Sequence, residues 1–145
     1  MVKQLVIMRG VSGSGKTTYV SHHFPSATVC SADHFFDRGA HPPSFDPKLL
    51  SLAHHQCLMS AMNSIENGDE YIVIDNTNTQ RWEYEHYIWL GNQFGYHIRI
   101  IRLQPPLAPE ILESRNVHQV TKQTIVNMLH RFEDDERELT ITSTE

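Results

Sequence analysis

A segment near the N-terminus, Gly10-Val11-Ser12-Gly13-Ser14-Gly15-Lys16-Thr17, matches the pattern GxxxxGK[ST] at every fixed position. An apolar run over residues 4–9 precedes the segment, and a helical pattern begins near residue 16. A loop of this kind between a strand and a helix is typical of α/β domains that bind nucleotide phosphates. A glycine turn that binds nothing is the alternative, and the flanking strand and helix argue against it.

The residue types of this loop suit a phosphate. The glycines allow backbone angles closed to other residues, so successive N–H groups turn inward on an anion, and the following helix adds its positive end. Lys16 is expected to reach the terminal phosphates, and the Thr17 hydroxyl is expected to ligate Mg²⁺. We therefore predict that ATP is bound by Gly10, Val11, Ser12, Gly13, Ser14, Gly15, Lys16, Thr17 and Thr18.

The rest of the chain alternates short β-rich runs with longer helical segments, which indicates an α/β fold with a mostly parallel sheet. Predicted strands cover residues 4–9, 27–31, 71–74 and 97–103. Predicted helices run from about 16 to 25, 47 to 67, 80 to 94, 109 to 116 and 122 to 138. We expect a P-loop NTPase/kinase fold with four to five strands flanked by helices, in a single domain over residues 1–145.

The charge balance restricts the possible partners. The formal net charge is −5, whereas proteins that hold long nucleic acids usually carry a basic surplus. A nucleic-acid substrate would therefore need a local basic cluster, for which the candidates are Arg99, Arg102, Arg115, Lys122 and Arg131.

Hydropathy and cysteine usage favour a cytoplasmic protein without membrane contact. No apolar run approaches the roughly 20 residues that cross a bilayer. Cys30 and Cys57 stand apart in apolar contexts, which favours reduced core thiols. A disulfide between them is the alternative.

Two carboxylates follow predicted strands, where ligands of open α/β sheets bind. Asp75 ends an apolar run, as in a Walker-B strand, and is expected to hold Mg²⁺ directly or through water. Asp33 lies where an acceptor hydroxyl would approach the γ-phosphate, so it is the candidate general base. For each residue the alternative is an N-cap or turn-forming carboxylate. An NKxD-like guanine reader is absent from the sequence, which argues against a GTPase.

Four stretches, in this order, resemble polynucleotide 5′-hydroxyl kinases. They are residues 10–18, Ser31-Ala32-Asp33-His34-Phe35-Phe36, Asp75-Asn76-Thr77-Asn78 and Arg115-Asn116-Val117-His118-Gln119-Val120. They look even closer to the kinase-like AAA/P-loop domains of certain ubiquitin-ligase-binding proteins, which belong to the same group. The resemblance spans nearly the whole chain.

The resemblance implies roles for particular residues. Lys16, Asp33 and Arg115 would be catalytic, with Asp33 activating the acceptor 5′-hydroxyl. The substrate would be contacted by Asp33, His34, Asn76 and Asn78. A short helical lid at about residues 107–121 would close over ATP, with Arg115 neutralising charge on the transferred phosphoryl group. The alternative for Arg115 is a surface helix arginine paired with Glu113 or with nearby acidic residues.

The sequence departs from the family in its lid. Relatives tend to read His-Gly-Val-Pro where this chain reads His118-Gln119-Val120-Thr121, and the lid holds a single arginine, with Lys122 as a stand-in. We therefore expect a different lid geometry. The aromatic pair Phe35-Phe36 stacks on a nucleobase in one interpretation and belongs to the core in the other.

Together these features predict an enzyme, an ATP-dependent phosphotransferase that uses ATP and Mg²⁺ to phosphorylate the 5′-hydroxyl of RNA or DNA. A small-molecule kinase acting on a nucleoside, sugar acid or similar hydroxyl is the first alternative, and the acidic charge balance favours it. The second alternative is a module that binds ATP, hydrolyses it slowly or not at all, and recruits partners.

Overall fold

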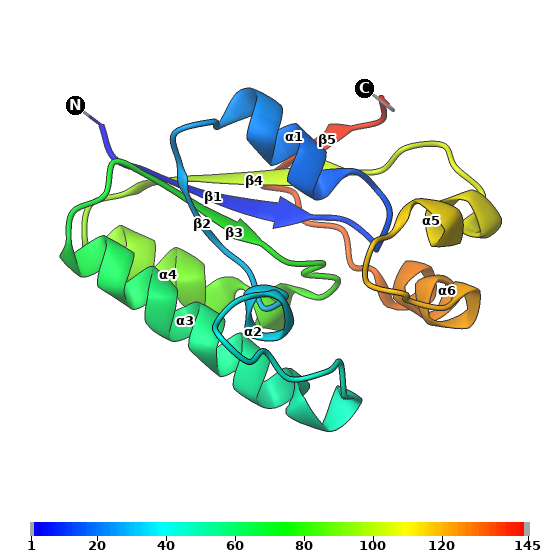
Figure 1. The fold of residues 1–145 in the computed structure, drawn as a ribbon. Helices are drawn as coiled ribbons and strands as arrows, with labels where there is room; N and C mark the ends of the chain where they lie inside the picture. The colour runs from blue at the N-terminus through cyan, green and yellow to red at the C-terminus, as the bar shows by residue number, and fades with distance from the viewer. Residues whose placement is uncertain (1, 144–145) are drawn as a thin grey trace.

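The computed structural model describes residues 2–143, and within them five strands form one parallel sheet in the order β2-β3-β1-β4-β5 (Figure 1). The strands are β1 (Gln4–Arg9), β2 (Thr28–Cys30), β3 (Tyr71–Asp75), β4 (His97–Leu103) and β5 (Glu138–Ile141). Every neighbouring pair runs parallel. The predicted fold class, a parallel α/β sheet flanked by helices, is confirmed.

Helices cover both faces of the sheet. They are α1 (Lys16–His23), α2 (His34–Asp37), α3 (Leu50–Glu66), α4 (Glu85–Gln93), α5 (Pro109–Arg115) and α6 (Lys122–Arg131), with single 3₁₀ turns η1 (Pro47–Leu49) and η2 (Arg81–Glu83). Figure 1 shows α1 on one face, α3 and α4 on the other, and α5 beside α6 beyond the carboxyl end of β1. The segment for which the sequence predicts a lid, residues 107–121, therefore contains α5 and lies at the end of the sheet where ligands bind.

The central strand explains how the layers are held together. Successive side chains of β1 point to opposite faces. Leu5 and Ile7 pack in the cluster beneath α3 and α4, whereas Val6 and Met8 pack in the cluster beneath α1. All four side chains are fully buried. A strand covered on both faces is apolar at nearly every position, which is why the sequence marked β1 so clearly.

A third apolar cluster places α5 and α6 against the phosphate loop. Val11 of the loop packs with Leu112 of α5 and Ile125 of α6, and all three side chains are buried. The apolar side of α6 therefore holds α5 and α6 together on the loop.

The prediction of one helix over residues 122–138 is wrong. The helix α6 ends at Arg131, Phe132 has extended backbone angles, and residues 138–141 form β5 beside β4. The cause is Arg9, whose side chain is fully buried at the end of β1 and requires acceptors. Its guanidinium donates to the Glu133 carbonyl at 2.6 Å and to the Glu138 carboxylate at 2.5 Å. If the helix continued to residue 138, the Glu133 carbonyl and the Glu138 carboxylate would no longer lie within hydrogen-bond distance of Arg9.

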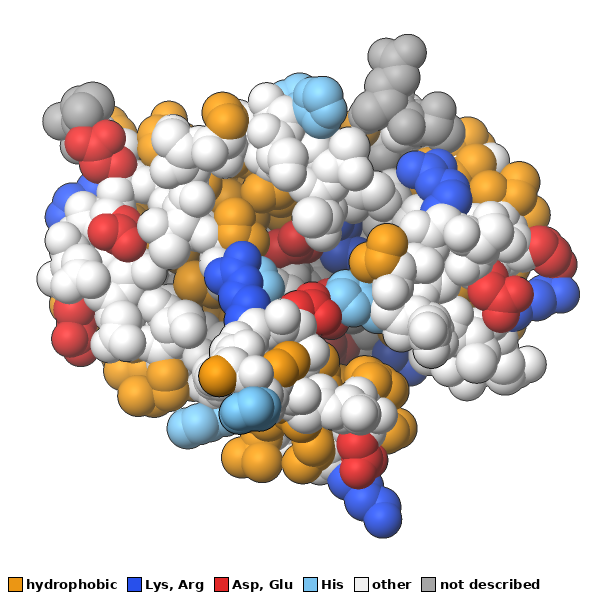
Figure 2. All heavy atoms as spheres, viewed as in Figure 1, with side chains coloured by type: hydrophobic (Ala, Val, Ile, Leu, Met, Phe, Trp, Pro, Cys, Tyr) orange, Lys and Arg blue, Asp and Glu red, His pale blue; other side chains and the backbone are white. Residues whose placement is uncertain are grey.

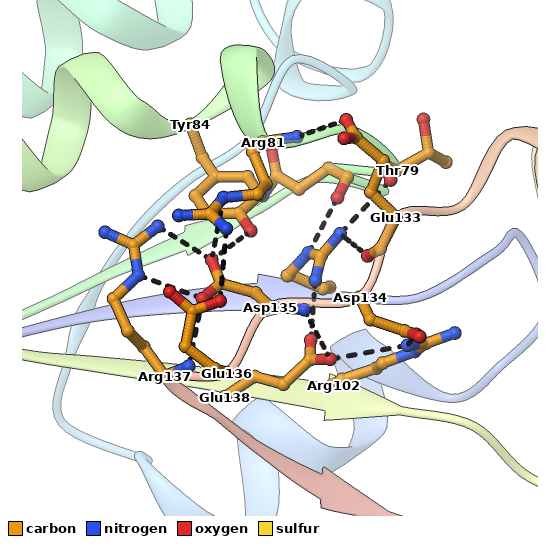
Figure 3. Close-up of polar contacts among 12 residues, drawn as sticks. Thr79, Arg81, Tyr84, Arg102, Glu133, Asp134, Asp135, Glu136, Arg137 and Glu138 are labelled. Carbon is orange, nitrogen blue, oxygen red and sulfur yellow. Dashed lines mark hydrogen bonds and ion pairs between the residues drawn. The ribbon is translucent and has the colours of Figure 1, made fainter.

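The segment that follows α6 is stabilised by a compact polar network (Figure 3). Figure 3 shows Asp135 between Tyr84 and Arg137. The Tyr84 hydroxyl donates to Asp135 at 2.6 Å, and Arg137 donates to both Asp135 oxygens at 2.9 and 2.7 Å. Arg137 holds the pKa of Asp135 well below its usual range, although burial opposes the shift. The carboxylate is therefore stably ionised inside the fold.

Candidate functional site

The phosphate loop joins β1 to α1 and depends on glycine at two positions. Gly13 and Gly15 have φ angles of 83° and 97°, in the left-handed region that other residues avoid. The side chain of Lys16 folds back over the loop, where its Nζ atom donates to the carbonyl oxygens of Gly10 at 2.8 Å and Val11 at 3.3 Å. The ammonium group thus lies on the loop that is expected to hold phosphate.

The chemistry of the loop fits an anionic ligand. Burial lowers the pKa of Lys16 below its ordinary value, while the charges of Asp75 and Asp33 act to raise it. Among the described residues, the buried hydroxyl of Ser14 has no hydrogen-bond partner. Phosphate oxygens supply a negative charge for Lys16 and acceptors for free donors of the loop.

Two oxygen ligands suited to Mg²⁺ lie beside the loop. The Thr17 hydroxyl donates to Asp75 Oδ2 at 3.1 Å, which joins the start of α1 to the end of β3. Burial raises the pKa of Asp75, and the Lys16 charge opposes the shift. Across residues 2–143 no group of three His, Cys, Asp or Glu side chains is placed to hold a metal. Magnesium at nucleotide sites needs only one or two carboxylates together with phosphates, so the pair fits.

Asp33 follows β2 and precedes α2. Its charge acts on both Lys16 and Asp75, so the three groups share one electrostatic environment. Asp33 occupies the N-cap position of α2, but its side chain makes no cap hydrogen bond. Its carboxylate is 55% exposed. The side chain is therefore open to a second reactant.

The two asparagines expected near the substrate hold the strand ends together. Asn76 accepts from the Ala32 N–H at 2.8 Å, and Asn78 donates to the Met8 carbonyl at 2.8 Å. Both side chains are buried. Their amides bond to backbone groups, so they position the segments that carry Asp33 and the phosphate loop. His34, expected to contact the substrate, is half-buried, and burial lowers its pKa.

The helix α5 contacts the phosphate loop directly. A Cβ atom added at Gly13 would lie 2.1 Å from the Leu112 carbonyl oxygen, and one added at Gly15 would lie 3.5 Å from Arg115 Nη2. Arg115 is therefore beside the loop. Glu113, the partner in the alternative interpretation, instead accepts from the backbone N–H of Lys122 at 2.6 Å.

The other basic residues named as a possible nucleic-acid cluster are engaged elsewhere. Lys122 pairs with Glu110 at 2.7 Å, and Arg102 pairs with Asp134 at 2.6 Å. Arg99 lies over the Phe24 ring at 5.7 Å. The sequence-based candidates therefore do not gather into one free basic patch beside the loop.

The structure adds residues to the site that the sequence analysis gave no role. His118, in the segment between α5 and α6, has its Nε2 atom 3.3 Å from Asp33 Oδ2 and its Nδ1 atom 3.8 Å from Asp37 Oδ1. The resemblance had included His118 in a quoted stretch, which was the available signal. Asp37 and Phe45 line a cavity together with Asp33 and His118. Neither residue belongs to a motif recognised in the sequence, so only the fold shows that they lie beside Asp33.

The thiols and the hydropathy of the helices agree with the sequence. Cys30 and Cys57 are buried and free, as predicted. Cys57 Sγ lies 3.3 Å from the Tyr87 hydroxyl and 3.6 Å from Asn76 Nδ2. Among residues 2–143, none of the helices has the length and apolar character required to cross a membrane.

Comparison with known proteins places the chain in context. A family model described as an AAA domain matches residues 5–134. NEDD4-binding protein 2 of Homo sapiens is 33% identical over 137 residues, which cover 89% of this chain. The chain spans only 8% of the length of that relative.

Solved structures share the fold at low sequence identity. A chain of the Pnkp1/Rnl/Hen1 RNA repair complex superposes with a TM-score of 0.68 at 17% identity, covering 90% of this chain and 44% of that chain. A gluconokinase from Sinorhizobium meliloti 1021 superposes with a TM-score of 0.57 at 13% identity, covering 96% of this chain and 82% of that one. These similarities show the fold.

Proposed function

The chain belongs to the AAA domain family whose model it matches, and we propose that it is an ATP-dependent phosphotransferase that moves the γ-phosphoryl group of ATP to a 5′-hydroxyl of RNA or DNA. One observation carries the proposal. Among the neighbouring strands, β2 is followed by Asp33, β3 ends at Asp75, and β1 leads into the phosphate loop. A candidate proton acceptor, a candidate metal ligand and a phosphate cradle therefore meet at one edge of the sheet.

The residues of the donor side neutralise negative charge. Phosphoryl transfer asks for positioning and electrostatic stabilisation more than for covalent chemistry by the protein. Lys16 is within the loop, and Arg115 approaches it from α5. In this proposal residues 107–121 act as the lid. Thr17 and Asp75 would hold Mg²⁺, which when bound supplies positive charge to the β- and γ-phosphate oxygens.

The acceptor side depends on Asp33. Its carboxylate is exposed enough to accept the proton of an incoming hydroxyl, while its backbone is fixed by neighbouring groups. The Asp33 N–H donates to Ser31 Oγ at 3.2 Å, and Asn76 holds the adjacent Ala32 N–H. A base held in this way is preorganised for proton transfer.

A small-molecule kinase is the second candidate, and specific observations favour it. The net charge is −5, and three of the five basic residues that would grip a long polyanion, Arg99, Arg102 and Lys122, are paired with acids or packed on a ring. In this second function the same donor side would serve a free nucleoside or another small hydroxyl compound.

Transfer of labelled γ-phosphate from ATP to a 5′-hydroxyl oligonucleotide tests the proposal. The matched control is the same oligonucleotide with a 5′-phosphate, which offers no acceptor hydroxyl. We expect label only on the first, with Lys16→Ala and Asp33→Asn each lowering turnover by at least ~10². Label on free nucleoside or gluconate alone supports the second candidate. ATP binding without label on any acceptor contradicts phosphotransfer.

A further inference from the structure

An open cavity of about 200 Å³ lies beside Asp33, between α2, the loop that follows it and residues 117–119. Figure 2 shows that this face of the molecule is hollowed near its centre, where acidic, histidine and basic side chains lie close together. The cavity is smaller than the roughly 300–1,000 Å³ of sites for drug-sized ligands. Its volume suits one ring-sized group next to the candidate base and is too small to enclose a base pair.

Part of the cavity wall is aromatic. The rings of Phe36 and Phe45 lie 5.2 Å apart, and Phe35 packs edge-on against Phe36 at 5.1 Å. Phe45 is 55% exposed, and Phe36 is half-buried. Neither Phe35 nor Phe36 is part of the buried clusters that form the core. The aromatic side chains are therefore available to stack on a ligand.

The polar part of the wall is acidic. Asp33 and Asp37 line the cavity together with His118, and its described lining residues include no lysine or arginine. The His118 ring, a planar group with nitrogen atoms on its edge, already lies between the two carboxylates. A phosphate or carboxylate group would be repelled there, whereas a flat uncharged ring with N–H donors is accommodated.

We propose that this cavity holds the base of the acceptor nucleoside, stacked on Phe45 and Phe36. The inference rests on the proposed transfer to a hydroxyl and specifies its substrate class. The base belongs either to a free nucleoside or to the unpaired 5′-terminal residue of a single strand. The charges of Asp33 and Asp37 oppose a sugar acid, because they would repel its carboxylate. The site is thus divided, with Lys16 and Arg115 on the phosphate side and carboxylates on the acceptor side.

Acceptors that differ only in their first residue test the proposal. Single-stranded 5′-hydroxyl oligonucleotides carry either a base or an abasic sugar at that position. We expect the KM for the abasic acceptor to be roughly 10-fold higher, and a blunt duplex to be used as poorly. Equal KM values for all three, or faster phosphorylation of gluconate than of nucleoside-containing acceptors, would overturn the inference.

Variants of Phe45 connect the preference to the cavity. Phe45→Ala is expected to raise the KM for the base-containing acceptor roughly 10-fold, leaving the ATP KM and the abasic acceptor unchanged. Phe45→Tyr keeps the ring and should retain the preference. Trp89→Ala removes another exposed aromatic, 62% accessible on α4, and serves as the control. A preference that survives Phe45→Ala contradicts stacking in this cavity.

A binding measurement separates this inference from the proposed function. Fluorescence anisotropy of 3′-labelled oligonucleotides reports the affinity for base-containing and abasic 5′ ends without turnover. Tighter binding of the base-containing end with no phosphate transfer supports the cavity and rejects the phosphotransferase. Phosphate transfer with equal affinities rejects the cavity and leaves the phosphotransferase. Competition by free nucleoside, followed by an assay of its phosphorylation, tells the two sources of the base apart.

Discussion

His118 Nε2 lies 3.3 Å from Asp33 Oδ2, which joins the segment after α5 to the carboxylate assigned to receive the acceptor proton. The side chains come from positions far apart in the sequence, and both line the acceptor cavity. An acceptor hydroxyl must therefore either displace the imidazole from this oxygen or use the other one.

Replacement of His118 should expose Asp33. We expect His118→Ala to lower the acceptor KM by roughly 2–10-fold, because the competing contact is worth about one hydrogen bond. The ATP KM should stay constant. The control is His130→Ala, since His130 is exposed on α6. A higher acceptor KM in initial-rate assays would instead mean that His118 contacts the acceptor.

Removal of the Asp75 charge should weaken the response to Mg²⁺. Asp75→Asn preserves the shape of the side chain but removes a ligand charge, so we expect turnover to fall by about 10² and half-saturating Mg²⁺ to rise about 10-fold. Thr17→Val should show the same trend, whereas Thr17→Ser retains the hydroxyl. Magnesium titrations of turnover at saturating ATP, carried out on the wild type and on each variant, measure both changes. An unchanged titration curve for Asp75→Asn would remove this residue from the metal site.

A side chain at Gly13 should separate α5 from the phosphate loop. Both Gly13→Ala and Gly95→Ala place alanine at a positive φ, which costs about 1–2 kcal/mol. A Cβ at Gly95 meets nothing within 4 Å, but at Gly13 it lies 2.1 Å from the Leu112 carbonyl oxygen. We expect faster hydrogen exchange across α5 and weaker ATP binding only in Gly13→Ala. Equal behaviour of the two variants would show that backbone strain alone is responsible.

Arg115 and Lys122 should differ in their effect on catalysis. Arg115 lies beside the loop, so Arg115→Ala should lower kcat by about 10–10² with little change in stability. Lys122 pairs with Glu110 and is 50% exposed, so Lys122→Ala should leave kcat within about twofold. Steady-state rates of both variants at saturating substrate measure the difference. A comparable loss in both variants would restore Lys122 as the stand-in for a second lid arginine.

The stability contributed by Asp135 should depend on pH. Because Arg137 depresses its pKa in the folded state, the contribution is present above the ordinary aspartate pKa and is lost as the pH falls toward the folded value. We expect Asp135→Asn to lower the free energy of unfolding by about 2 kcal/mol at pH 7, with the difference narrowing below about pH 4. Urea denaturation across this range measures it. Asp134→Asn, at a position with a 91% exposed side chain, is the control. A constant difference down to pH 2 would contradict the assigned ionisation.

Local patterns predicted much of the fold. The bounds expected for the strands at residues 4–9 and 97–103 are those observed. The first strand is marked by the unbroken apolar run of residues 5–8, which is typical of a strand covered on both faces. The second is rich in β-branched isoleucine and is followed by Pro105 and Pro106. The helix predicted from about residue 47 is preceded by Asp46, which caps the turn before α3 by accepting from the Lys48 N–H at 2.9 Å, and Pro47 follows it at the first position of that turn. The predicted resemblance to P-loop kinases is also confirmed by the family match and the shared fold.

Features that depend on distant residues were beyond the sequence. The Arg9–Glu138 pair joins positions 129 residues apart, and without it the charged run over 133–138 looks like the end of a solvated helix. The cavity beside Asp33 likewise forms only because residues 117–119 fold against the region of α2. Nothing in the sequence around Phe45 or Asp37 indicates that the two residues line one cavity.

The buried pairing of Arg9 with Glu138 also bears on synthesis of the protein. Arg9 is synthesised early, whereas its partner Glu138 is synthesised 129 residues later. At about 5–20 residues per second, that interval lasts roughly 6–26 s. Burying the Arg9 charge without its partner costs several kcal/mol. We therefore expect β1, which leads into the phosphate loop, to remain unburied until Glu138 has been synthesised. Nascent chains that stop short of β5 should therefore be poor at capturing nucleotide and good clients for chaperones.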